Sequence, residues 1–129
     1  MALQMRSLTG ALAAAAVAAT SMIASAPAAQ AAFSDCPTGA FCLWQDASYN
    51  GLIWNRSGTT GWLNFATAIN DQATSGANRR GTLDSAANND ANGGGASFCF
   101  NGNTQTTNVG ISWNDRFSSA RNYDSSSVC

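Results

Sequence analysis

The sequence contains no histidine, no lysine and no glutamate. Without histidine, a nucleophile activated by an imidazole base is excluded, and so are the usual zinc sites that use imidazole ligands. The charged residues are six arginines and seven aspartates, a balance that argues against a nucleic-acid partner, which would require a clustered basic surface. Solubility must therefore rest on asparagine, serine, threonine and glycine.

Helical periodicity is nearly absent after residue 31. Short apolar or aromatic runs are separated by clusters of glycine, asparagine, aspartate and serine, a pattern typical of strands and turns. The sequence therefore predicts an all-β protein. The expected strands cover 41–44, 52–54, 61–65, 98–100 and 119–123, with a short polar edge at 75–80.

The amino-terminal segment has the pattern of a signal peptide. Arg6 precedes an alanine-rich apolar run from Leu8 to Ile23, and Ala29-Gln30-Ala31 provides a small-x-small cleavage site. The apolar run is too short and too weakly apolar to predict a membrane span. We expect residues 1–31 to be removed, leaving 32–129 as one secreted domain with no membrane segment.

Four cysteines follow this segment, namely Cys36, Cys42, Cys99 and Cys129. An even number of cysteines in an exported chain predicts disulfide bonds, for which three pairings exist. Pro37 and Gly39 can turn the chain back between the first two cysteines, so we favour Cys36–Cys42. The second pair would then be Cys99–Cys129.

The stretch 81–96 is rich in glycine and asparagine. Such a composition predicts high backbone entropy and little surface to bury, as in a flexible linker or a long loop. We expect this segment to connect two similar halves, at about 36–80 and 97–129.

One six-residue pattern occurs twice, 44 residues apart: Asn70-Asp71-Gln72-Ala73-Thr74-Ser75 and Asn114-Asp115-Arg116-Phe117-Ser118-Ser119. Each copy supplies a carboxylate, an amide oxygen and a hydroxyl, which suit a hard cation such as calcium. The alternative interpretation is that both copies are simply turns, because these residue types form local hydrogen bonds to the backbone.

These features resemble two related groups of proteins. The hairpin pattern Trp44-x-x-x-x-Tyr49-x-Gly51, together with the repeated turn, resembles the microbial βγ-crystallins. The opening segment from Cys36 to Asp46 resembles secreted bacterial proteins grouped with the Streptomyces metalloproteinase inhibitor. The resemblance implies a disulfide-stapled, βγ-crystallin-like sandwich of two Greek-key halves.

The resemblance also implies a calcium site at the two turns. Side-chain ligands would come from Asp71 and Asp115, and from the hydroxyls of Thr74 and Ser118. Backbone carbonyls would complete the shells near Asn70, Gln72, Asn114 and Arg116. With one carboxylate per turn, the expected dissociation constants are about 10⁻⁴ to 10⁻³ M.

The function implied by the resemblance is inhibition of an extracellular metallopeptidase. We expect a monomer that is not an enzyme, because the only acidic side chains are aspartates and nothing in the sequence positions a catalytic pair. The segments 101–108 and 81–96 are the candidate inhibitory loops, but the inhibitory bond itself cannot be placed on this sequence. The alternative is a calcium-stabilised binding or antimicrobial module with no inhibitory activity, which the export signal, the four tryptophans and the cysteines also fit.

Overall fold

A computed structural model describes residues 32–128; the predicted signal peptide (1–31) and Cys129 lie outside the described residues. The strands are β1 (Ala40–Asp46), β2 (Asn50–Ser57), β3 (Leu63–Asn64), β4 (Ser75–Asn78), β5 (Ser85–Asn88), β6 (Ser97–Phe100), β7 (Gln105–Thr106) and β8 (Ser119–Asn122). Short 3-10 turns are η1 (Phe33–Asp35), η2 (Ala47–Tyr49) and η3 (Ala91–Gly93). Within these residues, no helix has the length and apolarity needed to cross a membrane.

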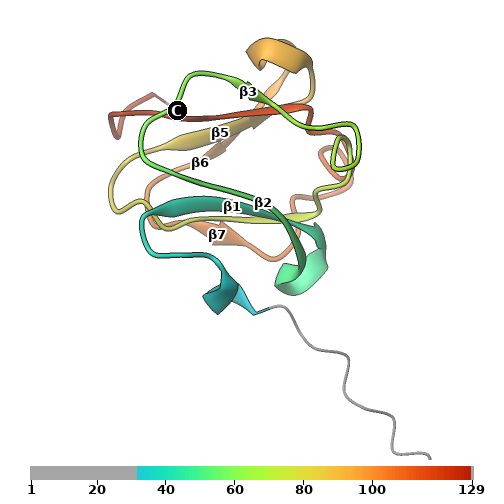
Figure 1. The fold of residues 1–129 in the computed structure, drawn as a ribbon, viewed down its shortest axis with the longest axis horizontal. Coiled ribbons are helices and arrows are strands. Elements are labelled where there is room, and N and C mark those ends of the chain that lie inside the picture. Colours follow the sequence, from blue (N-terminus) through green and yellow to red (C-terminus); the bar gives the residue numbers. More distant parts are fainter. Residues whose placement is uncertain (1–31, 129) are drawn as a thin grey trace, which may run out of the picture.

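The predicted all-β class is confirmed. The strands form two antiparallel sheets with the orders β2-β1-β4-β7 and β3-β8-β5-β6. Figure 1 shows β1, β2 and β7 in one layer and β3, β5 and β6 in the other. Each sheet takes three strands from one half of the chain and its fourth from the other half, since β3 and β7 are exchanged.

The repeated turns and the 3-10 turns η2 and η3 lie 44 residues apart in the two halves. In the first half, the Ser75 hydroxyl donates to the Asp46 carbonyl at 2.7 Å and accepts from the Tyr49 amide at 3.2 Å. In the second half, the Ser119 hydroxyl donates to the Asp90 carbonyl, also at 2.7 Å. The last residue of each repeated pattern therefore fastens the 3-10 turn of its own half to the sheet.

The prediction of a flexible connection over 81–96 is wrong. This stretch contains β5 and η3, and β5 lies between β6 and β8 with all four residues buried. The small side chains of Ala86 and Ala87 let this central strand lie against its neighbours without displacing the aromatic core. The second half therefore begins at β5, and not at residue 97.

The prediction of a polar edge at 75–80 is also wrong, because β4 lies between β1 and β7 and is buried throughout. A Cβ atom on Gly76 would lie 2.6 Å from the Phe100 ring, so only glycine fits at this position. The strand expected at 61–65 shortens to β3 and joins the opposite sheet. The strands expected at 41–44, 52–54 and 98–100 are confirmed within β1, β2 and β6.

Aromatic rings fill the space between the sheets. Phe41 contacts Phe100 with ring centroids 4.8 Å apart and Trp54 with centroids 5.4 Å apart. The same buried cluster includes Leu43, Phe65, Val109 and Phe117. Burial of these side chains supplies the main driving force for folding.

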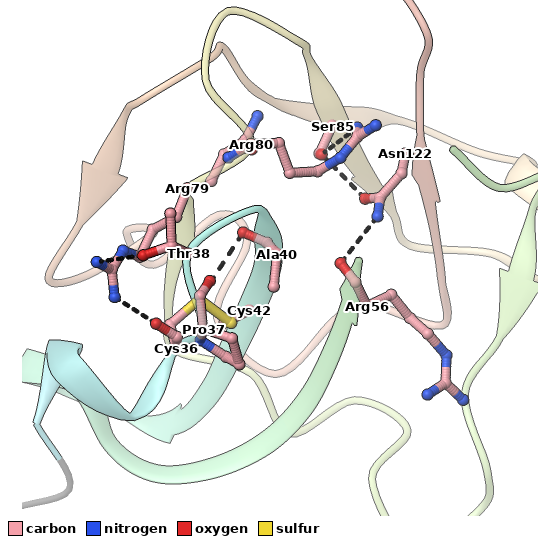
Figure 2. The surroundings of a disulfide bond; sticks show 11 residues. Cys36, Pro37, Thr38, Ala40, Cys42, Arg56, Arg79, Arg80, Ser85 and Asn122 are labelled. Atoms are coloured by element: carbon pink, nitrogen blue, oxygen red, sulfur yellow. Dashed lines mark hydrogen bonds between the residues drawn. A yellow bond between two sulfur atoms is a disulfide. The ribbon is translucent and has the colours of Figure 1, made fainter. Parts of the chain in front are cut away.

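The predicted disulfide between Cys36 and Cys42 is confirmed. Figure 2 shows the Arg79 guanidinium donating to the Cys36 carbonyl and, at 3.3 Å, to the Thr38 hydroxyl, which fixes the loop that the disulfide closes. Cys99 is also disulfide-bonded. Its predicted partner, Cys129, lies outside the described residues.

Buried polar side chains join the ends of the sheets. The side-chain amide of Asn122 donates to the carbonyls of Arg56 at 3.0 Å and Gly58 at 2.9 Å. Its side-chain oxygen accepts from the Ser85 hydroxyl at 3.0 Å. Figure 2 places Arg80 beside this group. Its guanidinium donates to the Tyr123 carbonyl at 2.7 Å, and burial lowers the pKa of Arg80.

Candidate metal site at the crossed turns

The structure brings the two repeated turns together. The Asp71 amide donates to the Phe117 carbonyl at 3.0 Å, and the Asp115 amide donates to the Ala73 carbonyl at 3.2 Å. Each turn therefore pairs with the other through the residue at the same place in its pattern. This reciprocal pairing places the predicted ligands of both turns in one region.

Each turn also orients its own carboxylate. Asp71 and Asp115 have φ values of 56° and 54°, in the left-handed region that aspartate and asparagine tolerate better than most residues. The side-chain amide of Asn70 donates to the Asp71 carboxylate at 2.7 Å, and that of Asn114 donates to the Asp115 carboxylate at 2.9 Å. The two asparagines therefore use their side chains to hold the carboxylates, which leaves their backbone carbonyls as candidate ligands.

Oxygen atoms from different turns converge on two cavities. The Ser118 hydroxyl donates to the Asp71 carboxylate at 3.3 Å, across the junction between the turns. Gln72, Thr74 and Asp115 line the larger cavity. Asp71 and Arg116 line the smaller one, together with Asp115. Arg116 directs its guanidinium to the Ser112 carbonyl at 3.2 Å.

The structure adds residues that the sequence pattern missed. Gln45 and Asp46, before η2, line the larger cavity, and Asn89 and Asp90, before η3, line the smaller one. They occupy matching positions in the two halves, 44 residues apart. Extending the offset of the turns back to the first hairpin would have identified them.

The donor set at the smaller cavity fits a hard cation. The Asn89 side-chain oxygen is buried and has no hydrogen-bond partner among the described residues. A Cβ on Gly95 would lie 2.4 Å from this oxygen and 2.6 Å from an Asp90 carboxylate oxygen. The absence of a side chain at Gly95 therefore leaves space beside these two oxygens. Asp71, Asp90 and Asp115 all line this cavity, but within residues 32–128 no three acidic, histidine or cysteine side chains are arranged so that they could hold a metal ion by themselves. Any ion here would depend on amide, hydroxyl and carbonyl oxygens as well as carboxylate.

Comparisons with known proteins agree with the resemblance predicted from the sequence and with the observed fold. Residues 29–86 match the family model described as peptidase inhibitor family I36. No curated protein matches the chain.

Several solved structures share the fold. A βγ-crystallin domain from Flavobacterium johnsoniae is 26% identical, with a TM-score of 0.51 over 64% of this chain and 92% of that one. A βγ-crystallin domain from Clostridium beijerinckii is 21% identical, with a TM-score of 0.53 over 67% and 99% of the two chains. The βγ-crystallin from Ciona intestinalis is 20% identical, with a TM-score of 0.53 over 66% and 100%. The resemblance found in the sequence is thus confirmed: residues 29–86 are similar to peptidase inhibitor family I36, and the chain has a βγ-crystallin-like fold.

Proposed function

We propose that the protein is a secreted inhibitor of a metallopeptidase. The observation that carries this proposal is the match of residues 29–86 to a family of peptidase inhibitors. The disulfide inside the matched segment is consistent with an oxidising compartment outside the cytosol. The signal-peptide pattern of residues 1–31 supports the same location.

The fold supports inhibition because tight binding requires loops that are already ordered before the complex forms. Of the two loops suggested by the sequence, 81–96 has residues 85–88 in the buried strand β5 and residues 91–93 in η3. The segment 101–108 contains β7, which pairs with β4, and is therefore ordered before any complex forms. The Thr104 hydroxyl also donates to the Asn101 carbonyl at 2.6 Å, and the backbone amide of Asn78 donates to the Thr104 carbonyl at 2.8 Å.

Titration against thermolysin tests this proposal. We expect the mature protein at micromolar concentration to abolish hydrolysis of a small chromogenic substrate, because a rigid loop occupies the active site and is released slowly. The control is the same chain after reduction and alkylation, which competes only as an ordinary substrate. Full thermolysin activity in the presence of the native protein would refute the proposed function.

We also propose that the crossed turns bind calcium and that this binding stabilises the fold. Asp71 and Asp115 would supply carboxylate oxygens, and Thr74 and Ser118 would supply hydroxyls. Carbonyls near Asn70, Gln72, Asn114 and Arg116 would complete the shells. The reciprocal hydrogen bonds between the turns support this ligand set, since each cavity is lined by residues of both turns. An all-oxygen set of low charge suits weak calcium binding.

Thermal unfolding in calcium and in chelator tests the calcium proposal. At a calcium concentration of ten times the dissociation constant, each site adds about 1.4 kcal/mol, which raises the melting temperature by about 6–11 °C for a domain of this size. We expect Asp71→Gly and Asp115→Gly each to reduce the shift. Glycine is chosen because it tolerates the positive φ of both positions.

The matched control is Asp124→Ala, which removes an exposed carboxylate outside the turns and should leave the calcium shift unchanged. Equal melting temperatures of the wild type in calcium and in chelator would contradict calcium binding. A calcium shift without any inhibition of thermolysin would favour the alternative, a calcium-stabilised binding or antimicrobial module.

A further inference from the structure

Ile111 is the most exposed large apolar side chain in the described part of the molecule. It is 96% exposed, whereas Val128, the other exposed large apolar residue there, is 48% exposed. A single apolar residue on a surface is common and carries no argument by its exposure alone. The way in which the chain holds Ile111 is more informative.

The backbone on both sides of Ile111 is fixed by other residues. Before it, Val109 is buried and its amide donates to the Thr74 carbonyl at 2.8 Å. After it, the amides of Trp113 and Asn114 donate to the Gly110 carbonyl at 3.0 and 2.9 Å. Trp113 in turn packs against Phe98 and Phe117 in the core. The apex is therefore ordered without any contribution from the Ile111 side chain.

The other half of the molecule shows that the turn does not need an apolar apex. There, the amides of Ile69 and Asn70 donate to the Ala66 carbonyl at 2.9 and 3.0 Å, which reproduces the same turn 44 residues earlier. The position that matches Ile111 is Thr67, which is also exposed. Because threonine serves the same fold, the turn itself does not require isoleucine at position 111.

We propose that Ile111 is the residue that this protein inserts into the apolar specificity pocket of its target metallopeptidase; the inference rests on the proposed inhibitory function. Polar side chains surround it on the rim of the larger cavity, including Asn108 and Asn114. An apolar anchor within a polar rim is the arrangement found where binding energy concentrates in an interface.

The geometry further indicates that Ile111 acts as a plug and that the bond before it is not cut. The Gly110 carbonyl already accepts two hydrogen bonds from its own turn. It is therefore not free to bind the active-site metal ion, as the carbonyl of a cleaved substrate must. The chain recovered from the complex should be intact.

Inhibition of thermolysin by four proteins tests the proposal: the wild type, Ile111→Asn, Ile111→Leu and the matched control Thr67→Asn. We expect Ile111→Asn to weaken inhibition at least about tenfold, because a polar amide would be buried in an apolar pocket. Ile111→Leu should stay within about threefold of the wild type, since it keeps the apolar volume. Thr67→Asn should inhibit like the wild type, and all variants should melt together because both positions are exposed.

The outcomes separate this inference from the proposed function. If the wild type does not inhibit, the proposed function is wrong and this inference falls with it. If the wild type inhibits and Ile111→Asn inhibits equally well, only the role of Ile111 is wrong. Cleavage between Gly110 and Ile111, seen by mass spectrometry, would overturn the plug. So would a wild-type dimer that Ile111→Asn converts to a monomer, because Ile111 would then face a second copy.

Discussion

Replacing Asn122 with alanine is expected to lower the free energy of unfolding by about 2–4 kcal/mol. The side chain is fully buried. Its NH₂ group donates to the carbonyls of Arg56 and Gly58, and its oxygen accepts from the Ser85 hydroxyl. Alanine leaves these groups without their partner and also leaves a cavity. Denaturant unfolding followed by tryptophan fluorescence gives the change directly.

The control for this prediction is Asn55→Ala, which truncates an exposed asparagine on β2 and should cost less than about 0.5 kcal/mol. A second comparison uses the repeat. Asn78 stands 44 residues before Asn122 and donates to the carbonyls of Leu83 at 2.8 Å and Phe100 at 2.7 Å. Asn78→Ala should therefore cost about as much as Asn122→Ala. If Asn122→Ala matched the exposed control, these bonds would contribute little to stability.

Replacing Gly93 with alanine is expected to cost about 3–4 kcal/mol, from two separate causes. The residue has a φ of 74°, which any side chain makes unfavourable. In addition, its Cβ would lie 2.2 Å from the Trp62 indole, which covers the glycine. The indole would have to move, and its edge contact with Tyr123 would move with it.

Two variants divide the cost of Gly93→Ala into its parts. Gly58 has nearly the same φ, 71°, but a Cβ there would meet nothing within 4 Å. Gly58→Ala should therefore report the backbone cost alone, about 1 kcal/mol. Making Gly93→Ala in a Trp62→Ala background should reduce its cost to a similar value. An unchanged cost in that background would show that the indole is not the obstacle.

The crossed turns were the part of the site that the sequence predicted well. Asparagine, aspartate and serine favour turns through local hydrogen bonds, and the structure has a turn at each copy of the pattern. The side-chain bonds from Asn70 and Asn114 to the neighbouring carboxylates were not predicted. The pairing of the turns could be anticipated only through the resemblance. It depends on how distant strands pair, which no local pattern encodes.

The second half begins at β5 and not, as predicted, at residue 97. The prediction for 81–96 was wrong because it rested on amino-acid composition alone. Glycine and asparagine over 81–96 suggested a flexible linker or a long loop, yet small residues are what a buried central strand and a covered turn require here. Gly93 stands where the first half has Tyr49, which packs edge-on against Trp44 with ring centroids 5.1 Å apart. In the second half, the indole of Trp62 comes from the first half and covers this position. Composition could not show that a distant aromatic side chain supplies the missing volume.

The exchange of β3 and β7 constrains the order in which the protein can mature. A chain made from its amino terminus cannot complete its first sheet until residues 105–106 are available to lie beside β4. The second sheet, in turn, needs Leu63–Asn64 to remain unpaired until β8 emerges. An isolated half therefore lacks one edge of its own sheet, so a protein truncated after β4 should not persist as a folded fragment.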